Sequence, residues 1–510
     1  MEIDTFNNYE IALKKVARGG FILFFGSIIG KVSGFFRQFI IIRMLSPELY
    51  GLFALGLAFY NIIINIGHLG LYHGSQRYIA FFTAAGEHSK VKGTIKNSLK
   101  IILCTSIILP SLLIAFSKPL SSFLNKPELH VVLLVFVLGL PLAMFNNIFI
   151  SFFLGFKRVE ITVFLNDILF NIFSILLMFG GLLLWKSVYT PIIALIITII
   201  IVFAITLYFY KKIIISSLKE VTTSHITGEL LLFSLPLFFS GISYMILNNT
   251  DTLMLSYYMP IDAVGFYNSA FLIMQTMPIF LTSLSTIFMP VLTGFVARKL
   301  NREARELYQT VTKWIFLLTF PAILTFFYFP RQILTTLFSA PYGQAGTALA
   351  ILVAAEFMHT TLGPNGQALI AYGATRAVFI GYGAATVLNI FLNALLIPRM
   401  GISGAAAATG MSLVVLNIFW STFLYAKFKI HPFGRKLLVP LALCLASAAA
   451  LYLPLRAMVN RAAWLAFACY PIFLVLGVAL TFVTRSYSEE DLLVLRAVKA
   501  RLGRIKRGEA

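Results

Sequence analysis

Ionisable side chains inside apolar segments are the residues of this sequence that could do chemistry. Lys31 and Arg37 lie in one long apolar segment, and only three of the nineteen acidic residues fall within such segments rather than at their ends: Asp167, Asp251 and Glu356. A charge at the centre of a bilayer costs about 2.5–3.5 kcal/mol on insertion scales. We therefore interpret these five side chains either as functional or as paired within the protein.

The two cations of the first apolar segment favour an anionic ligand. Lys31 and Arg37 are separated by six residues, roughly 240° around a helix, so they do not share one stripe. Their long side chains could still converge on a wide cavity, and we predict that both face one. Arg43 lies nearer the end of the segment, where it either adds to this cationic cavity or extends its head to the membrane interface.

The buried acids are candidates for ion coupling. Glu356 and His359 are three residues apart and hence on one helix face, and a carboxylate beside a histidine can change protonation near neutral pH. This pattern favours proton coupling; the alternative is a structural ion pair between Glu356 and Lys31 or Arg37. Asp251 and Asp167 are further coupling candidates.

Polar residues of two segments are candidates for lining the same cavity. Asp251 follows the polar run Asn248-Asn249-Thr250, which must face protein or water. Tyr60 and Asn61, in the second apolar segment, complete the set of predicted polar cavity residues.

Signatures of catalysis and of metal binding are not visible in the sequence. The three cysteines, Cys104, Cys444 and Cys469, fall inside apolar segments without metal-ligand spacing, and we interpret them as small buried hydrophobic residues. No nucleophile–base constellation stands out. We expect no catalytic residue, no metal and no cofactor, and a protein that is not an enzyme.

The elements that carry these residues are expected to be membrane-spanning helices. The 510 residues are 59% hydrophobic and 12% charged, with a mean hydropathy of +0.90, whereas soluble domains carry about 25% charged residues. A spanning helix needs about 20 apolar residues. The sequence predicts an all-α polytopic membrane protein of about fourteen spans: 19–43, 49–73, 97–116, 130–154, 161–184, 190–210, 229–256, 263–292, 310–330, 345–370, 377–398, 402–426, 436–455 and 462–484. Five of the prolines within these spans are expected to bend them: Pro141, Pro236, Pro278, Pro321 and Pro364.

The distribution of positive charge predicts the orientation. The net charge is +21, and 28 of the 40 Lys and Arg residues fall in the termini and alternate loops of one side, against 8 in the opposite loops. This is the positive-inside pattern, so we predict an inner-membrane protein with both termini in the cytoplasm. Attraction to anionic lipid explains the basic excess, and no nucleic-acid partner is needed.

Two segments repeat at a nearly constant offset. Glu48 and Gly51 match Asp262 and Gly265 at an offset of 214, and Gly155, Arg158 and Asn171 match Gly373, Arg376 and Asn389 at 218. Because each unit holds six spans, the two copies are parallel and face a central cavity, as in transporters that work by alternating access. The chance alternative is similarity among glycine-rich loops.

The duplication predicts the domain organisation. The expected parts are a cytoplasmic N-terminus (1–18), an N-lobe of six spans (19–210), a cytoplasmic linker (211–228), a C-lobe of six spans (229–428), two extra spans (429–484) and a basic tail (485–510). Leucines and valines at helical spacing make that tail a surface helix; its alternative is a solvated basic segment.

Several of these residues together resemble a known transporter family. The order of Gly30-Lys31-Val32-Ser33-Gly34-Phe35-Phe36-Arg37, Arg43-Met44-Leu45-Ser46-Pro47-Glu48-Leu49-Tyr50-Gly51, Asn249-Thr250-Asp251-Thr252 and Val264-Gly265-Phe266-Tyr267 resembles Wzx-type polysaccharide flippases of the multidrug/oligosaccharidyl-lipid/polysaccharide exporter superfamily. The resemblance covers nearly the whole chain. It implies two six-helix lobes and transfer of a polyprenyl-pyrophosphate-linked oligosaccharide from the cytoplasmic to the outer leaflet.

The resemblance also implies where cargo binds and where this sequence departs. Lys31 and Arg37 match cationic cavity residues of the related lipid II flippases, whereas Tyr60 stands where those have an Arg, and the eighth span, 263–292, holds no Lys or Arg. This argues against lipid II as cargo. The implied partners are the lipid-linked glycan, membrane lipid, H⁺ or Na⁺, and glycan polymerases or glycosyltransferases. The competing readings are a drug or metabolite exporter of the same superfamily and, more remotely, a membrane polysaccharide polymerase or ligase.

Overall fold

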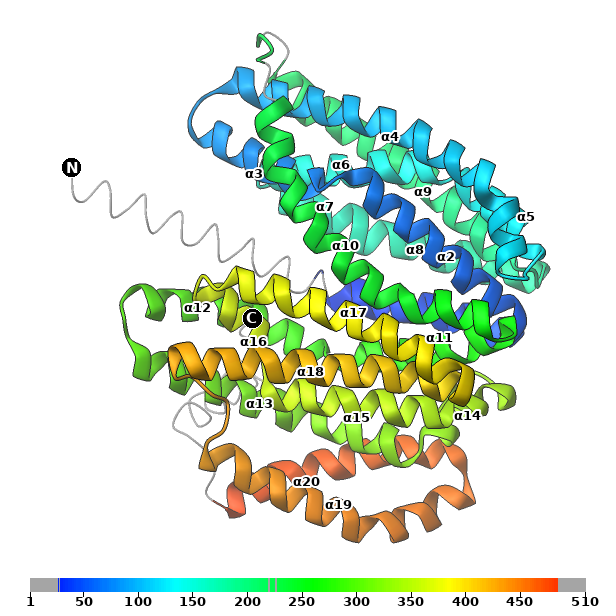
Figure 1. Cartoon of the computed structure of the whole chain (residues 1–510), viewed down its shortest axis with the longest axis vertical. Helices are drawn as coiled ribbons and strands as arrows, with labels where there is room; N and C mark the ends of the chain where they lie inside the picture. The colour runs from blue at the N-terminus through cyan, green and yellow to red at the C-terminus, as the bar shows by residue number, and fades with distance from the viewer. Residues whose placement is uncertain (1–25, 27, 219–220, 225–226, 485–510) are drawn as a thin grey trace, which may run out of the picture. The chain divides into compact units, whose positions relative to one another are not determined.

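The described part of the chain is helical. The structure is a computed structural model that describes residues 26, 28–218, 221–224 and 227–484; the predicted N-terminus (1–18) and basic tail (485–510) lie outside these residues. A first helical segment covers residues 28–44. The elements that follow, labelled in Figure 1, are α2 (Pro47–His68), α3 (Leu71–Ala84), α4 (His88–Phe123), α5 (Glu128–Val137), α6 (Leu140–Gly155), α7 (Val159–Thr162), η1 (Val163–Leu169), α8 (Phe170–Leu184), α9 (Tyr189–Phe209), η2 (Tyr210–Ile215), α10 (Thr227–Tyr258), α11 (Ile261–Thr276), α12 (Ile279–Ala297), α13 (Asn301–Tyr328), α14 (Pro330–Leu337), η3 (Ala340–Ala345), α15 (Gly346–Leu362), α16 (Asn365–Ala371), α17 (Thr375–Met400), α18 (Ile402–Phe428), α19 (Arg435–Arg461), η4 (Ala463–Ala468) and α20 (Cys469–Val483).

The helices confirm a polytopic all-α membrane protein. Eleven described helices are long and apolar enough to cross a membrane, and two bent helix pairs raise the number to as many as thirteen if each pair is one span. The first predicted span, 19–43, runs into residues outside the described ranges. The predicted total of fourteen therefore stays a prediction.

Three of the five prolines mark breaks between helices. Pro141 follows a 45° bend between α5 and α6, and Pro278 lies in a 41° bend after α11. Pro364 caps the start of α16. Proline lacks an N–H and is tolerated in the first turn of a helix, so the chain restarts a helix at each of these points. Pro236 and Pro321 instead lie inside the continuous helices α10 and α13.

Tertiary contacts divide the chain into two units. Unit 1 comprises Met1–Leu272, Leu337–Ala348 and Tyr382–Thr409, and unit 2 comprises Ile273–Thr336, Leu349–Gly381 and Gly410–Ala510. This division differs from the predicted lobes, because unit 1 includes α10 and most of α17. The lobe boundaries 19–210 and 229–428 stay a prediction.

Unit 1 contains a reciprocal contact between the two copies of the repeated motif. A Cβ atom on Gly51 of α2 would lie 2.1 Å from the carbonyl oxygen of Ile261, and one on Gly265 of α11 would lie 2.1 Å from the carbonyl oxygen of Pro47. Each glycine thus touches the residue four positions before the other. Such i-to-j and j-to-i contacts are the signature of a two-fold axis, which supports the 214-residue offset.

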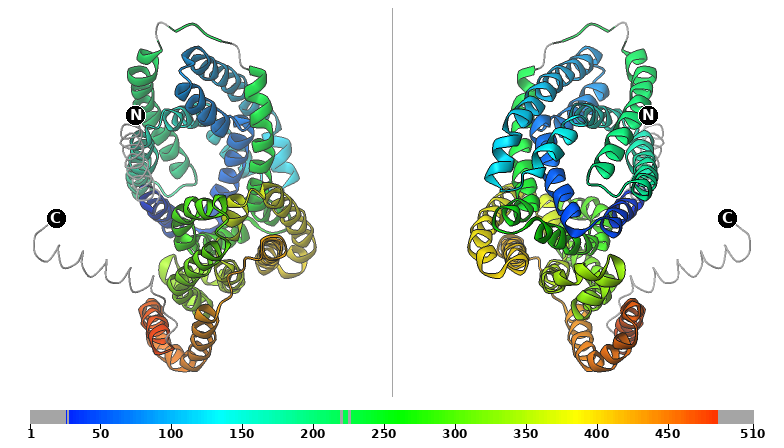
Figure 2. Two further views of the ribbon diagram at one scale, coloured as in Figure 1. Left: turned by 90° about the vertical axis from the view of Figure 1, so that its left-hand side faces the viewer. Right: turned by 90° about the vertical axis from the view of Figure 1, so that its right-hand side faces the viewer.

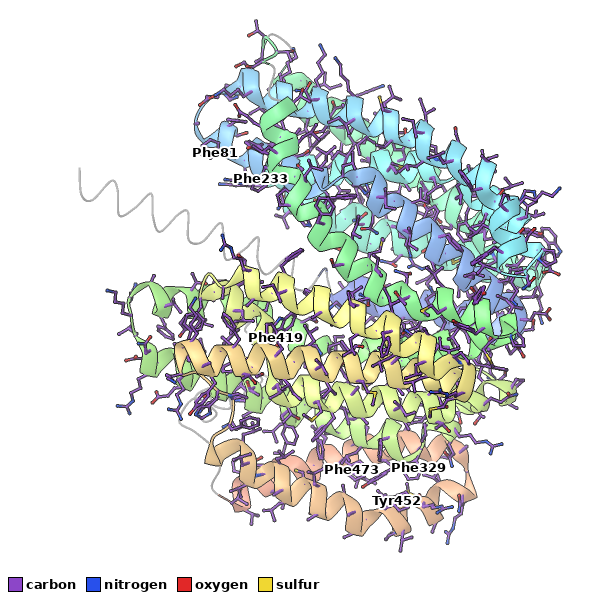
Figure 3. All side chains as sticks on the ribbon, in the orientation of Figure 1. Phe81, Phe233, Phe329, Phe419, Tyr452 and Phe473 are labelled. Carbon is purple, nitrogen blue, oxygen red and sulfur yellow. The ribbon has the colours of Figure 1, made fainter. Side chains whose placement is uncertain are left out.

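The second and third helices of unit 1 are joined by a left-handed turn. Leu69 and Gly70, between α2 and α3, have φ values of 47° and 74°, and Gly70 lies against the backbone of Ser234 in α10. A residue with a Cβ at Gly70 would overlap the Ser234 carbonyl oxygen at 2.1 Å. Farther along α3, Arg77 stacks on Phe233 at 4.0 Å, and Figure 3 shows Phe233 of α10 near Phe81 of α3.

Unit 2 is built around α13. The helix packs against α12, α19 and α20, and α19 and α20, orange and red in Figures 1 and 2, form a pair joined by η4. Aromatic rings fill the join: Phe329 stacks on Tyr452, and Tyr328 lies 6.3 Å from Phe473 between ring centroids. Figure 3 labels three of these rings, Phe329, Tyr452 and Phe473, where the end of α13 meets the pair.

Candidate functional site

Arg37 in the first helical segment is held by two residues of α8. Its Nη1 donates to Oδ1 of Asn171 at 3.5 Å, and its guanidinium carbon lies 5.5 Å from the centre of the Phe170 ring. A guanidinium within about 6 Å of a ring centre is attracted by the ring quadrupole. Both partners are neutral, so they orient the side chain and leave its charge in place.

A stripe of glycines brings this helical segment close to the element before α8. Cβ atoms on Gly26 and Gly30 would lie 2.4 Å from Val163 and 2.5 Å from Oδ1 of Asp167, both in the π-helix η1. Small residues allow such close helix approach in membranes. Asp167 is thereby placed beside Gly30, the residue before Lys31, and π-helical turns recur at functional sites.

Asp251 in α10 lies at the centre of a buried network of neutral donors. Its Oδ1 accepts from Asn389 at 3.2 Å and from Asn393 at 2.7 Å, and its Oδ2 accepts short hydrogen bonds from the hydroxyls of Tyr267 and Thr409. The carboxylate is 2% exposed, and Asn389 and Asn393 are fully buried. Among the described residues no cation lies within ion-pair distance of it.

The network is oriented by its own hydrogen bonds. Asn389 also donates to Thr409 at 3.0 Å and accepts from Asn393 at 3.1 Å. Both hydrogens of each amide are then used, and Oδ1 of Asn393 is left buried without a partner among the described residues. The unused capacity is therefore that of an oxygen acceptor beside a negative charge, which suits a proton or a small hard cation.

Glu356 and His359 meet as their spacing predicts, in unit 2. The carboxylate is 2% exposed, and its Oε1 lies 3.2 Å from Nδ1 of His359. Lys313 of α13 is also 2% exposed. Tyr308 of the same helix donates to the carbonyl of Leu362 at 2.6 Å, so α13 runs beside α15 and buried charges of both signs occupy neighbouring helices.

Arg43 is bound to a helix end. Its Nη1 donates a short hydrogen bond to the carbonyl oxygen of Phe338, the residue after α14. Cations are stabilised at helix C-termini, where carbonyl groups lack intrahelical partners. This contact favours a structural role for Arg43, and its cavity role stays a prediction.

The predicted polar cavity residues have mixed surroundings. Tyr60 is 6% exposed and packs on Phe136 with ring centres 5.4 Å apart, whereas Asn61 is exposed. Asn249 donates to the carbonyl of Met245 in its own helix at 2.9 Å, and Asn248 is partly buried. Whether any of them meets cargo stays a prediction.

Sequence reasoning missed most partners of the two charges. Among these partners of Arg37 and Asp251, Tyr267 is marked in the sequence only as part of the motif shared with the flippase family, and Asn171 and Asn389 only as matched positions of the repeat. Asn393 and Thr409 are not marked at all. One signal was available: Asn389 and Asn393 are four residues apart in an apolar span, hence on one helix face.

Comparison with known proteins identifies a family and a fold. The family profile described as "Polysaccharide biosynthesis protein" matches residues 16–296, more than half of the chain, and a second profile, MatE, matches residues 236–395. The "Probable low-salt glycan biosynthesis flippase Agl15" of Haloferax volcanii is 26% identical over 192 residues. That match spans 36% of this chain and 40% of the relative.

Two solved structures share the fold over most of the chain. The lipid II flippase MurJ in an inward closed conformation aligns with a TM-score of 0.70 and 15% identity, covering 93% of this chain and 100% of that one. An inward-facing multidrug resistance MATE family transporter of the MOP superfamily aligns with a TM-score of 0.68 and 15% identity, covering 78% and 94%. At these identities the likeness shows the fold.

Proposed function

The chain belongs to the polysaccharide biosynthesis protein family and has the fold of MOP-superfamily transporters, and from this premise we propose that it is a flippase for a lipid-linked glycan. The cargo is a polyprenyl-pyrophosphate-linked oligosaccharide, moved from the cytoplasmic to the outer leaflet by alternating access. The purpose is the synthesis of cell-surface polysaccharide. The "flippase" in the name of the Haloferax volcanii relative supports this assignment.

The environment of Arg37 is the observation that carries the proposal. A cation inside an apolar helix, held by an amide oxygen and an aromatic ring, keeps its full charge for a ligand. Arginine binds phosphate oxygens through two parallel N–H donors. A pyrophosphate supplies such oxygens, while the apolar polyprenyl tail remains in lipid. A cargo that is both charged and apolar can therefore be bound without burying an unpaired charge.

Lys31 adds a second cation about 1.7 helical turns earlier and is exposed. A diphosphate carries charge on both phosphates, so two cations on one helix fit it better than one. An ammonium with rotatable donors tolerates varied phosphate positions. We therefore assign Lys31 and Arg37 together to the anionic part of the cargo.

The Asp251 network is proposed as the coupling site. A buried carboxylate with one spare oxygen acceptor beside it, Oδ1 of Asn393, fits a proton or Na⁺, whose binding would change the charge of the network. Such a change can bias one of two conformations, because a ligand shifts an equilibrium by its differential affinity for the states. Glu356 with His359, and Asp167, remain further coupling candidates.

The location and partners follow from the same proposal. The protein resides in the inner membrane with both termini in the cytoplasm, as the 28-to-8 distribution of Lys and Arg predicts. Its partners are the lipid-linked glycan, membrane lipid, and glycan polymerases or glycosyltransferases that act before or after transfer. Transfer breaks no covalent bond, so no catalytic residue, cofactor or enzyme activity is required.

A drug or metabolite exporter is the second candidate. The MatE match over residues 236–395 and the shared fold with a multidrug transporter favour it. The cationic first helix argues against cationic drugs, because a like charge in the binding site repels them.

Leaflet exchange in liposomes tests the proposal. The purified protein is reconstituted, and transfer of a polyprenyl-pyrophosphate oligosaccharide is followed with and without a proton or sodium gradient. We expect exchange by the wild type and a loss of about tenfold or more in Lys31→Ala and Arg37→Ala, since hydrogen bonds to charged groups are worth about 1.5–3 kcal/mol.

The control is Lys118→Ala, a cation of equal charge at the end of α4. It should leave exchange unchanged. Absence of exchange with every lipid-linked glycan, together with extrusion of a soluble compound, would overturn the flippase proposal in favour of the exporter.

A further inference from the structure

Arg37 and Asp251 occupy equivalent positions in the two copies of the repeat. The first helical segment ends at residue 44 and α10 ends at Tyr258, so each charged residue lies seven positions before the end of its helix. The next helices begin at Pro47 and Ile261, again 214 apart, and the reciprocal contact of Gly51 with Gly265 fixes the same offset in space.

Each of these charges is bonded to an asparagine of a later helix in its own copy. Arg37 donates to Oδ1 of Asn171 in α8, and Asp251 accepts from Nδ2 of Asn389 in α17. An asparagine side chain carries an acceptor at one end and a donor at the other. One ancestral arrangement can therefore serve a cation in one copy and an anion in the other by turning the amide around.

The orientation of the Asn171 amide is fixed by the backbone. Its Nδ2 donates to the carbonyl oxygen of Asp167 at 2.9 Å and lies 3.5 Å from that of Asn166. The side chain is 5% exposed. A flipped amide would place its oxygen against those two carbonyl oxygens, so Oδ1 is held toward Arg37.

The carboxylate of Asp167, one helical turn before Asn171, lies away from Arg37. Asp167 lies against Gly30, which is seven residues and about 10 Å along the helix from Arg37. Arg37 has no carboxylate within ion-pair distance in the described part of the chain. Asn171 therefore orients the guanidinium without neutralising it, which an acidic residue at this position could not do.

We infer that Asn171 is a positioning residue that holds Arg37 for a phosphate or diphosphate anion. Because Asn171 is uncharged, Arg37 keeps its charge, and this copy of the duplicated site binds an anion. The inference rests on the proposed function for the identity of the cargo. It adds the residue that sets the charge of the site, because the opposite copy, centred on Asp251, takes the opposite charge.

Binding of inorganic pyrophosphate to the purified full-length protein tests the inference. Asn171→Asp keeps the shape of the side chain and places a carboxylate next to Arg37. We expect it to weaken pyrophosphate binding about 10- to 100-fold at neutral pH, and to regain affinity on acidification as the introduced carboxyl takes up a proton. Asn171→Leu should weaken binding less and without this pH dependence, because Arg37 keeps its charge and loses only its orientation.

A double-mutant cycle separates this role from a merely structural one. If Asn171 acts through Arg37, then Asn171→Asp should have no further effect on pyrophosphate binding in an Arg37→Gln background. The matched control is Asn146→Asp, because Asn146 is a buried asparagine of unit 1 that accepts from Thr206 at 2.9 Å. The control should bind pyrophosphate as the wild type does.

Each outcome bears on the inference separately from the proposed function. Equal affinity of wild type and Asn171→Asp, or additive effects of the two substitutions, would overturn the positioning role. A coupled loss of pyrophosphate binding by a protein that exchanges no lipid-linked glycan would retain the role of Asn171 while rejecting the glycan cargo. Folding of every variant is checked by its thermal unfolding midpoint.

Discussion

At the scale of the residue, the chain places opposite charges in one duplicated setting. Arg37 is bonded to an amide oxygen and Asp251 to amide and hydroxyl donors. Neutral partners therefore satisfy both side chains without a buried ion pair. A buried ion pair would satisfy itself and leave nothing for a ligand, since the two charges attract each other most strongly in a low-dielectric interior. These surroundings support the proposal of two ligand sites, one for an anion at Arg37 and one for a cation at Asp251.

The Asp251 network yields a prediction about coupling. Asp251→Asn removes the charge that would attract a proton or Na⁺, so leaflet exchange should lose its acceleration by an ion gradient. The same reconstituted liposomes measure this as the ratio of rates with and without the gradient. Thr409→Val keeps the carboxylate and removes one donor, and it should shift the ion concentration of half-maximal acceleration without abolishing it.

A matched control for this charge change lies nearby. Asp262→Asn alters an acid of the first turn of α11 that bonds its own neighbour, Ala263, and it should keep the full gradient ratio. If the gradient accelerates leaflet exchange by Asp251→Asn as much as by the wild type, then Asp251 is not the coupling residue. Glu356 with His359 would then be the next candidate.

At the scale of the element, backbone features decide where helices break and touch. Proline restarts a helix at Pro141, Pro278 and Pro364 because each begins a new segment, where no N–H is needed. Glycine instead determines where the backbones of two helices can touch. At Gly51 and Gly265 two helices cross with their backbones in touch, an approach that any Cβ would prevent.

The glycine crossing yields a prediction about stability. Gly51→Ala would place a methyl group 2.1 Å from the carbonyl oxygen of Ile261, so the helices must separate. We expect the free energy of unfolding to fall by about 1–3 kcal/mol, the usual cost of overpacking. Denaturation in mixed micelles measures the change, and Gly265→Ala should behave alike because the contact is reciprocal.

A glycine with open space around it is the control. A Cβ on Gly180 of α8 would meet no described atom within 4 Å, so Gly180→Ala should stabilise the helix by about 0.5–1 kcal/mol. Equal effects of Gly51→Ala and Gly180→Ala would contradict the close packing of the two helices at Gly51.

At the scale of the whole molecule, charge and hydropathy set how the chain lies in the membrane. The described helices are apolar over lengths that match a bilayer, and large apolar side chains such as Leu184 and Val483 are exposed on them. Exposure of this kind is expected where lipid replaces water as the solvent. The positive charges of the loops then determine the orientation of the chain in the membrane.

The orientation yields a labelling prediction. In a variant whose three cysteines are replaced by Ser, a single cysteine at Lys186, between α8 and α9, should react with a membrane-impermeant maleimide added outside intact cells. One at Lys299, between α12 and α13, should react only after the membrane is opened, because the positive-inside pattern places that loop in the cytoplasm. Both positions are exposed. The reverse labelling pattern would invert the predicted topology.

The sequence by itself determined the class, most of the spans and the duplication. Continuous apolar runs specify membrane helices because backbone groups in lipid must be satisfied within the segment. The offset of 214 between Gly51 and Gly265 was readable as text, and so were the rare charges Lys31, Arg37, Asp251 and Glu356, since a charge in an apolar run is conspicuous. The contact of Glu356 with His359 followed from helical spacing alone.

Only the tertiary structure decided what those charges touch. Arg37 and Asn171 are 134 positions apart, and Asp251 and Thr409 are 158 apart, distances over which no local period operates. The same holds for the breaks between helices: these five prolines look alike in sequence, yet three of them stand at the start of a new helix and two lie inside a continuous one. The direction of the Asn171 amide, fixed by the carbonyl oxygen of Asp167, likewise depends on where the π-helix places that carbonyl. Long-range packing, which no pattern of residue types encodes locally, thus gives the isolated charges of the sequence their partners and their orientation.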